Sequence, residues 1–430
     1  MLVRYTRDES GKTVQQALIY TSEEHKIQSK DIDPEAMKIA RRLRASGHSA
    51  YVVGGAVRDL MLGKHPKDFD IATDAQPNRI RRLFRNSRVI GKRFRLVHIF
   101  FNDDIIEVST FRSENSASFQ NEYGEIEEDV KRRDFTVNAL YYDPVAEQVV
   151  DYVGGVEDVR ERRLKPVIPL DRIFAEDPVR MIRAVKYATS GNLKMAGKLR
   201  RLIKRSANLL AQISPSRITE EVFKILLSGH SSAIIRECIG FGLFPHMIPN
   251  VCKLTESDPA FRETVLTRLA EFDREVKEGN ERRRSRAIAY LAADFLYTKT
   301  ATGAAGRIVF NEAFTDIKRF IQPIVPANKD VEMGLVYLVR RRKNYLKAGM
   351  LESTPPSDRP YHPDAEPRRS SSADRKSADR QAAGRKAGRS GSGRSSSRRS
   401  GTSRAASPRP RPSGSAPTQP DARSEAAPGH

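Results

Sequence analysis

Cysteine, long apolar runs and clustered histidines are what this sequence of 430 residues lacks. Two cysteines, Cys238 and Cys252, are too few for a disulfide framework or a zinc cluster, and their scarcity fits a reducing cytoplasm. No uninterrupted apolar run is long enough to span a bilayer, and the first residues lack the apolar segment of a secretory signal. The eight histidines are scattered, which argues against a metal-dependent phosphohydrolase. We therefore expect a cytoplasmic protein with no membrane partner.

Charge is the most informative part of the composition. The chain has 76 Lys and Arg residues against 54 Asp and Glu residues, which gives a formal net charge of +22. Such an excess favours a polyanionic partner, nucleic acid first and an acidic membrane surface second. The alternative is a solvated basic tail that only aids solubility. The hydrophobic fraction of 38% is low for a globular chain and indicates that part of the sequence does not fold.

The first part of the chain changes its pattern near Pro34. Residues 1–33 are polar and weakly periodic, which predicts a partly ordered lead-in. Residues 34–165 mix short apolar runs with helical periodicity, and this mixture predicts a small α/β domain built on a mixed sheet. The predicted strands cover 50–53, 69–72, 95–101 and 105–111, and the predicted helices cover 56–62 and 77–84.

From Phe174 onward strand signals almost vanish and amphipathic helices follow one another. At Glu352 the composition changes abruptly, and Ser, Arg, Gly, Pro and Ala dominate the rest of the chain. Residues 352–430 cannot bury enough apolar surface to offset their ordering entropy, so we predict a disordered basic tail. The fold class is therefore α+β, a mixed-sheet domain followed by an all-helical region. The predicted helices cover 178–189, 195–212, 216–228, 231–241, 258–277, 283–298 and 305–323.

A pair of aspartates, Asp68 and Asp70, is the central motif. Alternation on a strand places both carboxylates on one face, with Phe69 and Ile71 on the other. Two carboxylates held in this way repel each other unless cations neutralise them, and hard Mg²⁺ ions prefer such oxygen ligands. Two bound Mg²⁺ ions would activate an attacking hydroxyl and stabilise a leaving pyrophosphate. The alternative is an Asp-rich turn that caps a helix.

The segment before the aspartates makes the metal interpretation stronger. A predicted strand ends at Gly54 and Gly55, and a helix follows. Bare backbone N–H groups at the start of a helix favour phosphate, and Arg58 lies one turn further along. The alternative is a tight strand-to-helix turn with no ligand. Paired glycines, an arginine and paired aspartates within one short unit favour a nucleotide triphosphate site.

Two residues are candidates for a third carboxylate in the metal site. Glu107 is flanked by apolar residues on a predicted strand, so alternation can turn it toward the aspartates; the alternative is an edge charge that faces water. Asp134 follows Arg132 and Arg133, and its alternative role is an intrahelical ion pair. In the helical pattern Asp134 and Asn138 share one face and could hold ribose hydroxyls, while Arg133 could bind phosphate.

A third motif opens the helical region. Asp177 is predicted at the N-cap of a helix, with Pro178 at its first position. On a helical wheel Asp177, Arg180 and Arg183 share one flank. A carboxylate beside an arginine presents acceptors and donors in a fixed fork, which could read the edge of a nucleobase without a template strand. The alternative is an N-cap with a surface salt bridge.

With these residues in hand, the chain resembles the class II branch of the DNA polymerase β-like nucleotidyltransferases, which holds bacterial poly(A) polymerases and CCA-adding enzymes. The resemblance covers roughly residues 45–190, and the motifs together are highly specific. The matching motifs are Gly54-Gly55-x-Val57-Arg58-Asp59 with Asp68-x-Asp70; Arg132-Arg133-Asp134-Phe135-Thr136-x-Asn138-Ala139; Asp151-x-x-Gly154-Gly155-x-x-Asp158; and Glu176-Asp177-x-x-Arg180.

The resemblance implies a domain organisation. It implies a catalytic head at 34–165, a helical neck at 166–230 that recognises the base and binds RNA, and a helical body and tail at 231–351 that bind RNA. In the family the residue that matches Asp134 is counted with the active-site acids, so the resemblance adds it to Asp68 and Asp70. Glu107 stays the physically better placed third metal ligand.

The stretch 85–99 resembles the one typical of poly(A) polymerases rather than that of CCA-adding enzymes. The implied reaction attaches AMP from ATP to RNA 3′ ends without a template, with two Mg²⁺ ions. The implied partners are mRNA and other transcripts, ATP and the RNA-decay machinery. A CCA-adding enzyme, which also uses CTP and stops after a fixed number of additions, is the nearer alternative. A non-catalytic RNA-binding relic of the fold is the other, although both aspartates are present.

Overall fold

The computed structural model describes residues 1–7, 12–91, 96–102, 104–113, 123–301 and 310–341, with only the backbone for 297–301 and 341. The predicted disordered tail at 352–430 lies outside these residues, as does part of the stretch 85–99. Within them, a mixed sheet is followed by helices, so the predicted α+β fold class is confirmed.

Nine strands of the described chain form one mixed sheet in the order β1-β2-β9-β8-β3-β4-β7-β6-β5. Strand β4 lies near its middle, antiparallel to β3 and parallel to β7. A two-stranded parallel sheet joins β10 to β11. The strands are β1 Leu2–Arg7, β2 Thr13–Tyr20, β3 Ala50–Val53, β4 Asp70–Thr73, β5 Ser87–Ile90, β6 Leu96–Phe101, β7 Asp104–Thr110, β8 Leu140–Asp143, β9 Gln148–Asp151, β10 Arg163–Leu164 and β11 Lys194–Met195.

The helices account for most of the remaining described residues. The short ones within the head are α1 Ser22–His25, η1 Ser29–Asp31, α2 Pro34–Ala45, α3 Gly55–Met61, α4 Pro77–Leu83, α5 Ile126–Lys131, η2 Thr136–Asn138 and α6 Gly155–Arg160. Those that follow are α7 Ile173–Glu176, α8 Val179–Gly191, α9 Gly197–Ser206, η3 Ala207–Gln212, α10 Pro215–Leu226, α11 Ser231–Phe241, α12 Phe244–Met247, α13 Pro249–Ser257, α14 Pro259–Lys277, α15 Arg284–Ala301, α16 Phe310–Phe320 and α17 Asn328–Arg341.

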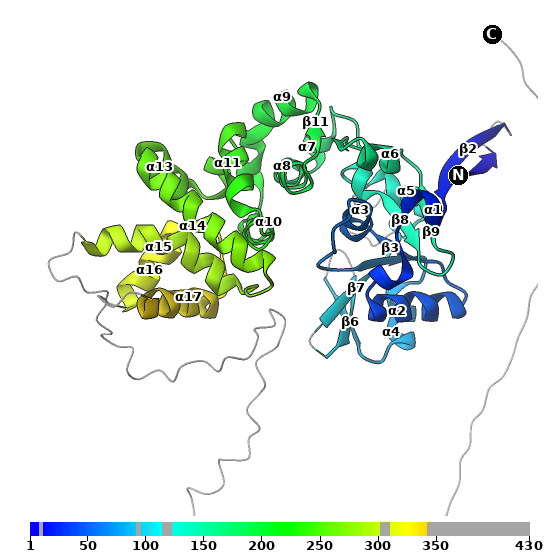
Figure 1. Ribbon diagram of the computed structural model, residues 1–430, viewed down its shortest axis with the longest axis horizontal. Coiled ribbons are helices and arrows are strands. Elements are labelled where there is room, and N and C mark those ends of the chain that lie inside the picture. The colour runs from blue at the N-terminus through cyan, green and yellow to red at the C-terminus, as the bar shows by residue number, and fades with distance from the viewer. Residues whose placement is uncertain (8–11, 92–95, 103, 114–122, 302–309, 342–430) are drawn as a thin grey trace, which may run out of the picture. The chain divides into compact units, whose positions relative to one another are not determined.

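The sheet is apolar on both faces because helices cover both of them. In β3, Val52 belongs to the core that includes residues of α2 and α4, whereas Tyr51 and Val53 belong to a second core beneath α5. Figure 1 shows α2 and α4 together along one side of the head strands. Ala72 of β4 also belongs to the second core. Asp70, two residues before Ala72, therefore lies on the face that α5 covers.

The two N-terminal strands correct the prediction for residues 1–33. β1 and β2 pair antiparallel, and β2 continues the sheet by pairing with β9. Almost every residue of β1 is exposed, so this edge strand carries little of the apolar alternation by which a strand is recognised. The sheet therefore starts at Leu2, well before Pro34.

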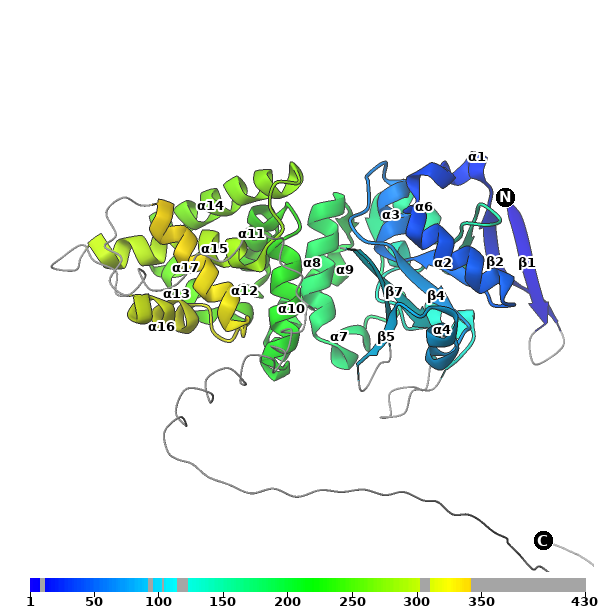
Figure 2. The ribbon, with the colours of Figure 1, turned by 90° about the horizontal axis from the view of Figure 1, so that it is seen from below.

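The helices after the head run from α8 in green to α17 in yellow (Figures 1 and 2), and many of their contacts join helices that are not consecutive, such as α8 with α11, α11 with α14 and α15 with α17. The helices predicted at 178–189, 216–228, 231–241 and 258–277 correspond to α8, α10, α11 and α14. Helices α12, α13 and α17 were not predicted. In the part of the chain that the structure describes, no helix has the length and apolar character needed to cross a membrane.

The side chain of Asp151 stabilises the tight turn between β9 and α6. Its Oδ1 accepts the N–H groups of Val153, Gly154 and Gly155 at 3.0, 2.9 and 3.0 Å, and its Oδ2 accepts that of Val156 at 2.9 Å. A Cβ at Gly155 would lie 2.2 Å from the carbonyl oxygen of residue 136, so only glycine permits this approach. The motif therefore packs α6 against η2, which carries part of the candidate site.

Candidate active site

The aspartate pair lies at the start of β4, as its alternation predicts. Asp70 is the first residue of the strand and pairs with Val53 of β3, and Asp68 lies two residues earlier. Both side chains are exposed, whereas Phe69 and Ile71 are 8% and 0% exposed. The two carboxylates therefore point away from the core that holds Phe69 and Ile71.

Glu107 lies on the same sheet face as Asp70. The parallel register pairs Ile71 with Val108, so Glu107 occupies the position next to Asp70 on the neighbouring strand. Its Oε1 lies 3.1 Å from Nε2 of His98, which is its cross-strand partner on β6. Among the described residues, no group of three His, Cys, Asp or Glu side chains has the arrangement needed to coordinate a metal ion. The backbone thus brings three carboxylates together, while Glu107 is turned toward His98.

The electrostatics of the cluster favour a cation. The pKa of Asp70 is raised to about 7, first by desolvation and then by the charges of Glu107 and Asp68, while Arg133 and Lys224 act in the opposite direction. The Asp70 side chain faces solvent, and the negative charges of Glu107 and Asp68 repel the charge of its carboxylate. Oxygen donors that repel one another in this way fit Mg²⁺ in chemistry.

The two glycines lie where the predicted phosphate cradle requires them. Gly54 has φ 72° and ψ −129°, a backbone conformation that favours glycine, and it forms the N-cap of the short helix α3. A Cβ built on Gly54 would lie 3.7 Å from Nη1 of Arg133. The same Nη1 donates to the carbonyl oxygen of Asn138 at 3.2 Å. The guanidinium of Arg133 thus lies beside the glycine turn.

Arg133 is held firmly in that position. Its Nε donates to the hydroxyl of Tyr141 at 2.8 Å, and its Nη2 donates to Oδ2 of Asp129 at 3.0 Å. Its guanidinium carbon lies 4.8 Å from the centroid of the Tyr141 ring. Although burial acts against the charge, Tyr141 and Asp129 raise the pKa of Arg133 further above its ordinary value. A fixed positive charge therefore stands next to the aspartate pair.

Arg58 is buried and bridges three groups. Its Nη1 donates to Oδ1 of Asn138 at 2.6 Å, and its Nε and Nη2 donate to Oδ1 of Asp59 at 2.9 and 2.8 Å. Its guanidinium carbon lies 4.9 Å from the ring centroid of Tyr187 on α8. A Cβ at Gly55 would lie 3.5 Å from its Nη2. The arginine is thus next to the glycine turn and is oriented by residues of two other elements.

Asp134 lies in a separate buried network. Its Oδ1 accepts the N–H of Phe135 at 2.8 Å and Nδ2 of Asn138 at 3.2 Å. Its Oδ2 lies 3.0 Å from Nη2 of Arg183, in an ion pair without a hydrogen bond. The predicted helix around Asp134 is interrupted, because α5 ends at Lys131 and residue 135 is extended. The contact between Asp134 and Asn138 nevertheless forms.

The predicted base-reading fork is divided between two other ion pairs. The helix α8 begins one residue later than predicted, with Pro178 rather than Asp177 at its N-cap position, although Oδ1 of Asp177 accepts the N–H of Val179 at 3.2 Å. Its Oδ2 binds Nη2 of Arg217 on α10 at 2.7 Å. Arg180 instead binds Glu176 through Nη1 at 3.0 Å. The motif therefore presents two neighbouring ion pairs, Asp177 with Arg217 and Arg180 with Glu176, where the sequence predicted one.

The loop before Asp68 is tied to helix ends of the helical region. Nζ of Lys67 donates to the carbonyl oxygen of Leu227 at 2.7 Å, directly after α10. Nζ of Lys64 donates to the carbonyl oxygen of Ser190 at 2.6 Å, near the end of α8. Sequence reasoning missed these contacts, together with Tyr187 and Arg217, because each joins residues far apart in the chain. Only the helical spacing of Tyr187 from Arg183 was a usable signal.

Two segments match known protein families. Residues 50–165 match the family described as "Poly A polymerase head domain", and residues 192–254 match the one described as "Probable RNA and SrmB- binding site of polymerase A". The first segment contains the aspartate pair, the glycine turn and Arg133. Residues 50–165 of this chain thus match a poly(A) polymerase head domain, and its relatives include proteins named as poly(A) polymerases and as CCA-adding enzymes.

Individual relatives agree with this family. Poly(A) polymerase I of Salmonella typhi is 39% identical over 297 residues, which cover 65% of this chain and 63% of that protein. Poly(A) polymerase I of Haemophilus influenzae is 39% identical, covering 59% of this chain and 60% of that protein. The CCA-adding enzyme of Lactobacillus helveticus is 36% identical, covering 47% and 52%. The chain thus spans less than two thirds of the length of these relatives.

Among solved structures, the CCA-adding enzyme of Bacillus stearothermophilus in complex with CTP is 23% identical to this chain. The comparison covers 72% of this chain and 94% of that chain, with a TM-score of 0.43.

Proposed function

We propose that this protein is a polynucleotide adenylyltransferase that adds AMP from ATP to RNA 3′ ends without a template. The observation that carries the proposal is the placement of Asp68, Asp70 and Glu107 on one sheet face beside Arg133, within a head domain of this family. The similarity to Poly(A) polymerase I favours ATP as the nucleotide. In this reaction the RNA 3′-oxygen forms a bond to the α-phosphorus of ATP, and the bond to the leaving pyrophosphate breaks.

The carboxylates would hold the metal ions of the reaction. Asp68 and Asp70 are proposed as the shared ligands of two Mg²⁺ ions, and Glu107 as the third carboxylate. When bound, the ions lower the pKa of the attacking hydroxyl and neutralise charge on the triphosphate. Glu107 has to turn from His98 toward Asp70 to take part, which needs only side-chain rotation because the register already places the two strands side by side.

The arginines are proposed to position the triphosphate and the nucleoside. Arg133, fixed by Tyr141 and Asp129 beside Gly54, would bind the phosphates together with the Gly54-Gly55 backbone. Arg58 would complete that contact. Asn138, Asp134 and Arg183 form the network behind it and would orient the ribose. Asp177 and Arg180 would read the adenine edge once their ion pairs with Arg217 and Glu176 rearrange.

The cellular setting is part of the proposal. The substrates would be mRNA and other transcripts, with the RNA-decay machinery as a partner, because an unstructured 3′ tail gives exonucleases a starting point. A cytoplasmic location fits Cys238 and Cys252, which are buried and free thiols. Basic residues of the helical region and the tail at 352–430 would attract RNA phosphates without reading sequence, so binding should weaken steeply with salt.

Primer extension with single nucleotides tests the proposal. The protein is incubated with a short RNA, Mg²⁺ and either ATP or CTP, and the products are resolved by length. A long ladder with ATP alone supports adenylyltransfer. Incorporation of CTP followed by a stop after a fixed number of additions would instead assign a CCA-adding enzyme, which the similarity to such enzymes keeps as the second candidate. Asp70→Ala is the matched variant: it should abolish AMP incorporation and leave RNA binding intact.

A further inference from the structure

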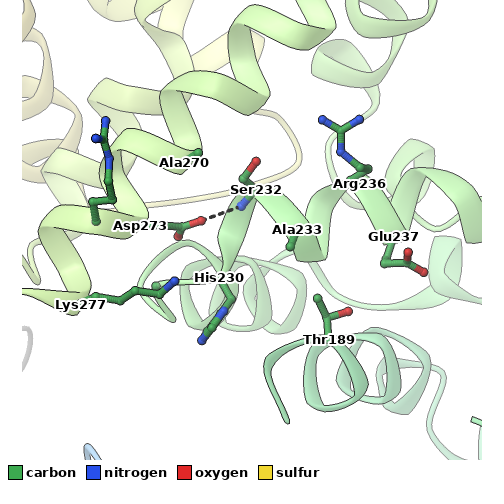
Figure 3. Close-up of a pocket in the computed structure, with 11 residues that line it drawn as sticks. Thr189, His230, Ser232, Ala233, Arg236, Glu237, Ala270, Asp273 and Lys277 are labelled. Carbon is green, nitrogen blue, oxygen red and sulfur yellow. Dashed lines mark hydrogen bonds between the residues drawn. The ribbon is translucent and has the colours of Figure 1, made fainter. Parts of the chain in front are cut away.

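A pocket of about 440 Å³ lies in the helical region between α8, α11 and α14. None of the predicted site residues lines this pocket, but hydrogen bonds connect residues next to it with the loop before Asp68. Figure 3 shows Lys277 extending toward His230, with Thr189 and Arg236 on the other side of the view. The residues whose chemistry matters here are Thr189, Gly229, His230, Arg236, Arg274 and Lys277.

Hydrogen bonds join this pocket to the loop that carries Asp68. Lys67, the residue before Asp68, donates to the carbonyl oxygen of Leu227 at 2.7 Å, two residues before Gly229 of the pocket. Lys64 donates to the carbonyl oxygen of Ser190 at 2.6 Å, and Ser190 follows Thr189 of the pocket. Two hydrogen bonds therefore tie the Asp68 loop to residues that lie one and two positions from the pocket lining.

Lysine and arginine side chains lie between Asp70 and the pocket. Lys224 is close enough to Asp70 to lower its pKa, and Arg282 is close enough to Lys67 to contribute, after desolvation, to a lowered pKa of that lysine. Burial lowers the pKa of His230, and Lys277, Lys64 and Lys67 lower it further. The exposed cations of this band are Lys64, Lys67, Lys224, Arg274, Lys277 and Arg282.

Two acidic side chains of the pocket offset part of this positive charge. The carboxylate of Asp273 accepts the N–H groups of Ser231 and Ser232 at 2.7 and 3.0 Å, so both of its oxygens are engaged at the start of α11, while its charge still acts on His230 and Lys67. Glu237 is the other acid on the lining, and Arg236 pairs at the rim with Glu263 at 3.1 Å. Arg274 and Lys277 therefore remain the exposed cations that face the pocket from α14.

We propose that this pocket binds a backbone phosphate of the RNA primer, upstream of the 3′ end that reaches Asp68 and Asp70. The occupant is the RNA backbone rather than a base, because the described residues that line the pocket include no Phe, Tyr or Trp on which a base would stack. Arg274 and Lys277 bind the phosphate, and the band of exposed cations leads the strand to the Asp68 loop. The inference rests on the proposed addition to RNA 3′ ends.

A charge-removal variant measured over a series of primer lengths tests this subsite. The double variant Arg274→Gln with Lys277→Gln is compared with wild type for binding to oligo(A) primers from a dinucleotide to about fifteen nucleotides. A short primer that fills only the catalytic site should bind both proteins equally. For longer primers the variant should lose affinity about fivefold. The slope of log Kd against log salt should also fall by about 0.7 for each phosphate that the variant no longer neutralises.

The matched control removes the same charges elsewhere. Lys318→Gln with Arg319→Gln changes one lysine and one arginine on α16, where neither residue lines the pocket. This control should bind every primer like wild type, and thermal melting should show both double variants folded. Equal loss at all lengths, the dinucleotide included, or no loss at any length beyond that of the control, overturns the subsite. Primer binding is measured without ATP. A wild-type protein that fails to add AMP would therefore contradict the proposed function, while the binding comparison would still test the phosphate subsite.

Discussion

The guanidinium carbon of Arg58 lies 4.9 Å from the ring centroid of Tyr187, so an arginine of the glycine-turn motif rests on a side chain of helix α8. Nζ of Lys186 lies 4.9 Å from the same centroid, and Nη2 of Arg183 donates to the Tyr187 hydroxyl at 3.2 Å. One aromatic ring thus orients cations from both the head and the helix that begins beside Asp177. We infer that Tyr187 is a positioning residue for the phosphate-binding arginine.

Replacing Tyr187 by Leu should weaken ATP binding with little effect on the chemical step. Each cation–π contact contributes about 0.5–2 kcal/mol, so loss of the ring should raise the KM for ATP by roughly twofold to thirtyfold. Tyr187→Phe keeps the ring and removes only the hydroxyl to which Arg183 donates, so it should restore most of the wild-type KM. Steady-state incorporation of AMP into a saturating RNA primer measures both constants.

A purely structural role for Tyr187 predicts a different pattern. In that case Tyr187→Leu lowers kcat and the melting temperature together and leaves the KM for ATP unchanged. If Tyr187→Phe were as impaired as Tyr187→Leu, the hydroxyl rather than the ring would position Arg58, and the cation–π argument would fail.

The sequence predicted the local geometry of the site because that geometry depends on short-range rules. Alternation placed Asp68 and Asp70 opposite Phe69, and burial in the structure follows the same alternation. Glu107 was predicted on the same argument, and the parallel register next to β4 places it beside Asp70. The start of a helix near Asp177 was likewise a local signal, since α8 has its N-cap one residue later, at Pro178, and Asp177 accepts the N–H of Val179.

The contacts that assemble the site from distant segments could not be predicted. Arg217 binds Asp177 across 40 residues, and nothing in the spacing of either motif indicates that pair. The stretch 85–99 favoured a poly(A) polymerase by resemblance alone. The structure adds a physical feature, since His98 in that stretch faces Glu107. The edge hairpin of β1 and β2 was missed because an exposed strand has no buried face for periodicity to reveal.

Separate substitutions should decide between Glu107 and Asp134 as the third metal ligand. Glu107→Gln should raise the Mg²⁺ concentration needed for half-maximal AMP incorporation, because it removes a negative ligand beside Asp70. Asp134→Asn should leave that concentration unchanged and lower the melting temperature, since it removes the buried carboxylate that pairs with Arg183. A Mg²⁺ titration of both variants, with thermal melting in parallel, gives the comparison. The assignment is reversed if only Asp134→Asn shifts the Mg²⁺ requirement.

Base selection should depend on Arg180 more than on Arg217. Arg180→Gln removes donors that we propose to face the adenine edge, so the preference for ATP over CTP should fall by roughly tenfold, equivalent to about 1.4 kcal/mol. Arg217→Gln frees Asp177 from its ion pair and should change the preference by less than about threefold. Competition between ATP and CTP for one primer measures the ratio. Equal preference in wild type and Arg180→Gln would remove Arg180 from base recognition.

The ion pair between Lys186 and Glu221 is a stability element behind Tyr187. Nζ of Lys186 lies 2.8 Å from Oε2 of Glu221, and the two side chains are only 10% and 9% exposed. Glu221→Gln should therefore lower the free energy of unfolding by about 3–5 kcal/mol, because it leaves a buried lysine charge unpaired. The double variant Lys186→Met with Glu221→Leu removes both charges and should recover most of that loss.

The effect of Glu221→Gln should also depend on pH. Burial acts to raise the pKa of Glu221, but the charges of Lys186, Lys224 and Arg183 outweigh it and hold the pKa below its ordinary value of 4.5. The ionised carboxylate therefore stabilises the fold above pH 4.5, and this contribution is lost as the pH falls through the lowered pKa. Melting temperatures of wild type and Glu221→Gln should differ most near neutral pH and converge in acid. A gap that stays constant down to the acid limit would show that packing, rather than the charge of Glu221, accounts for the loss.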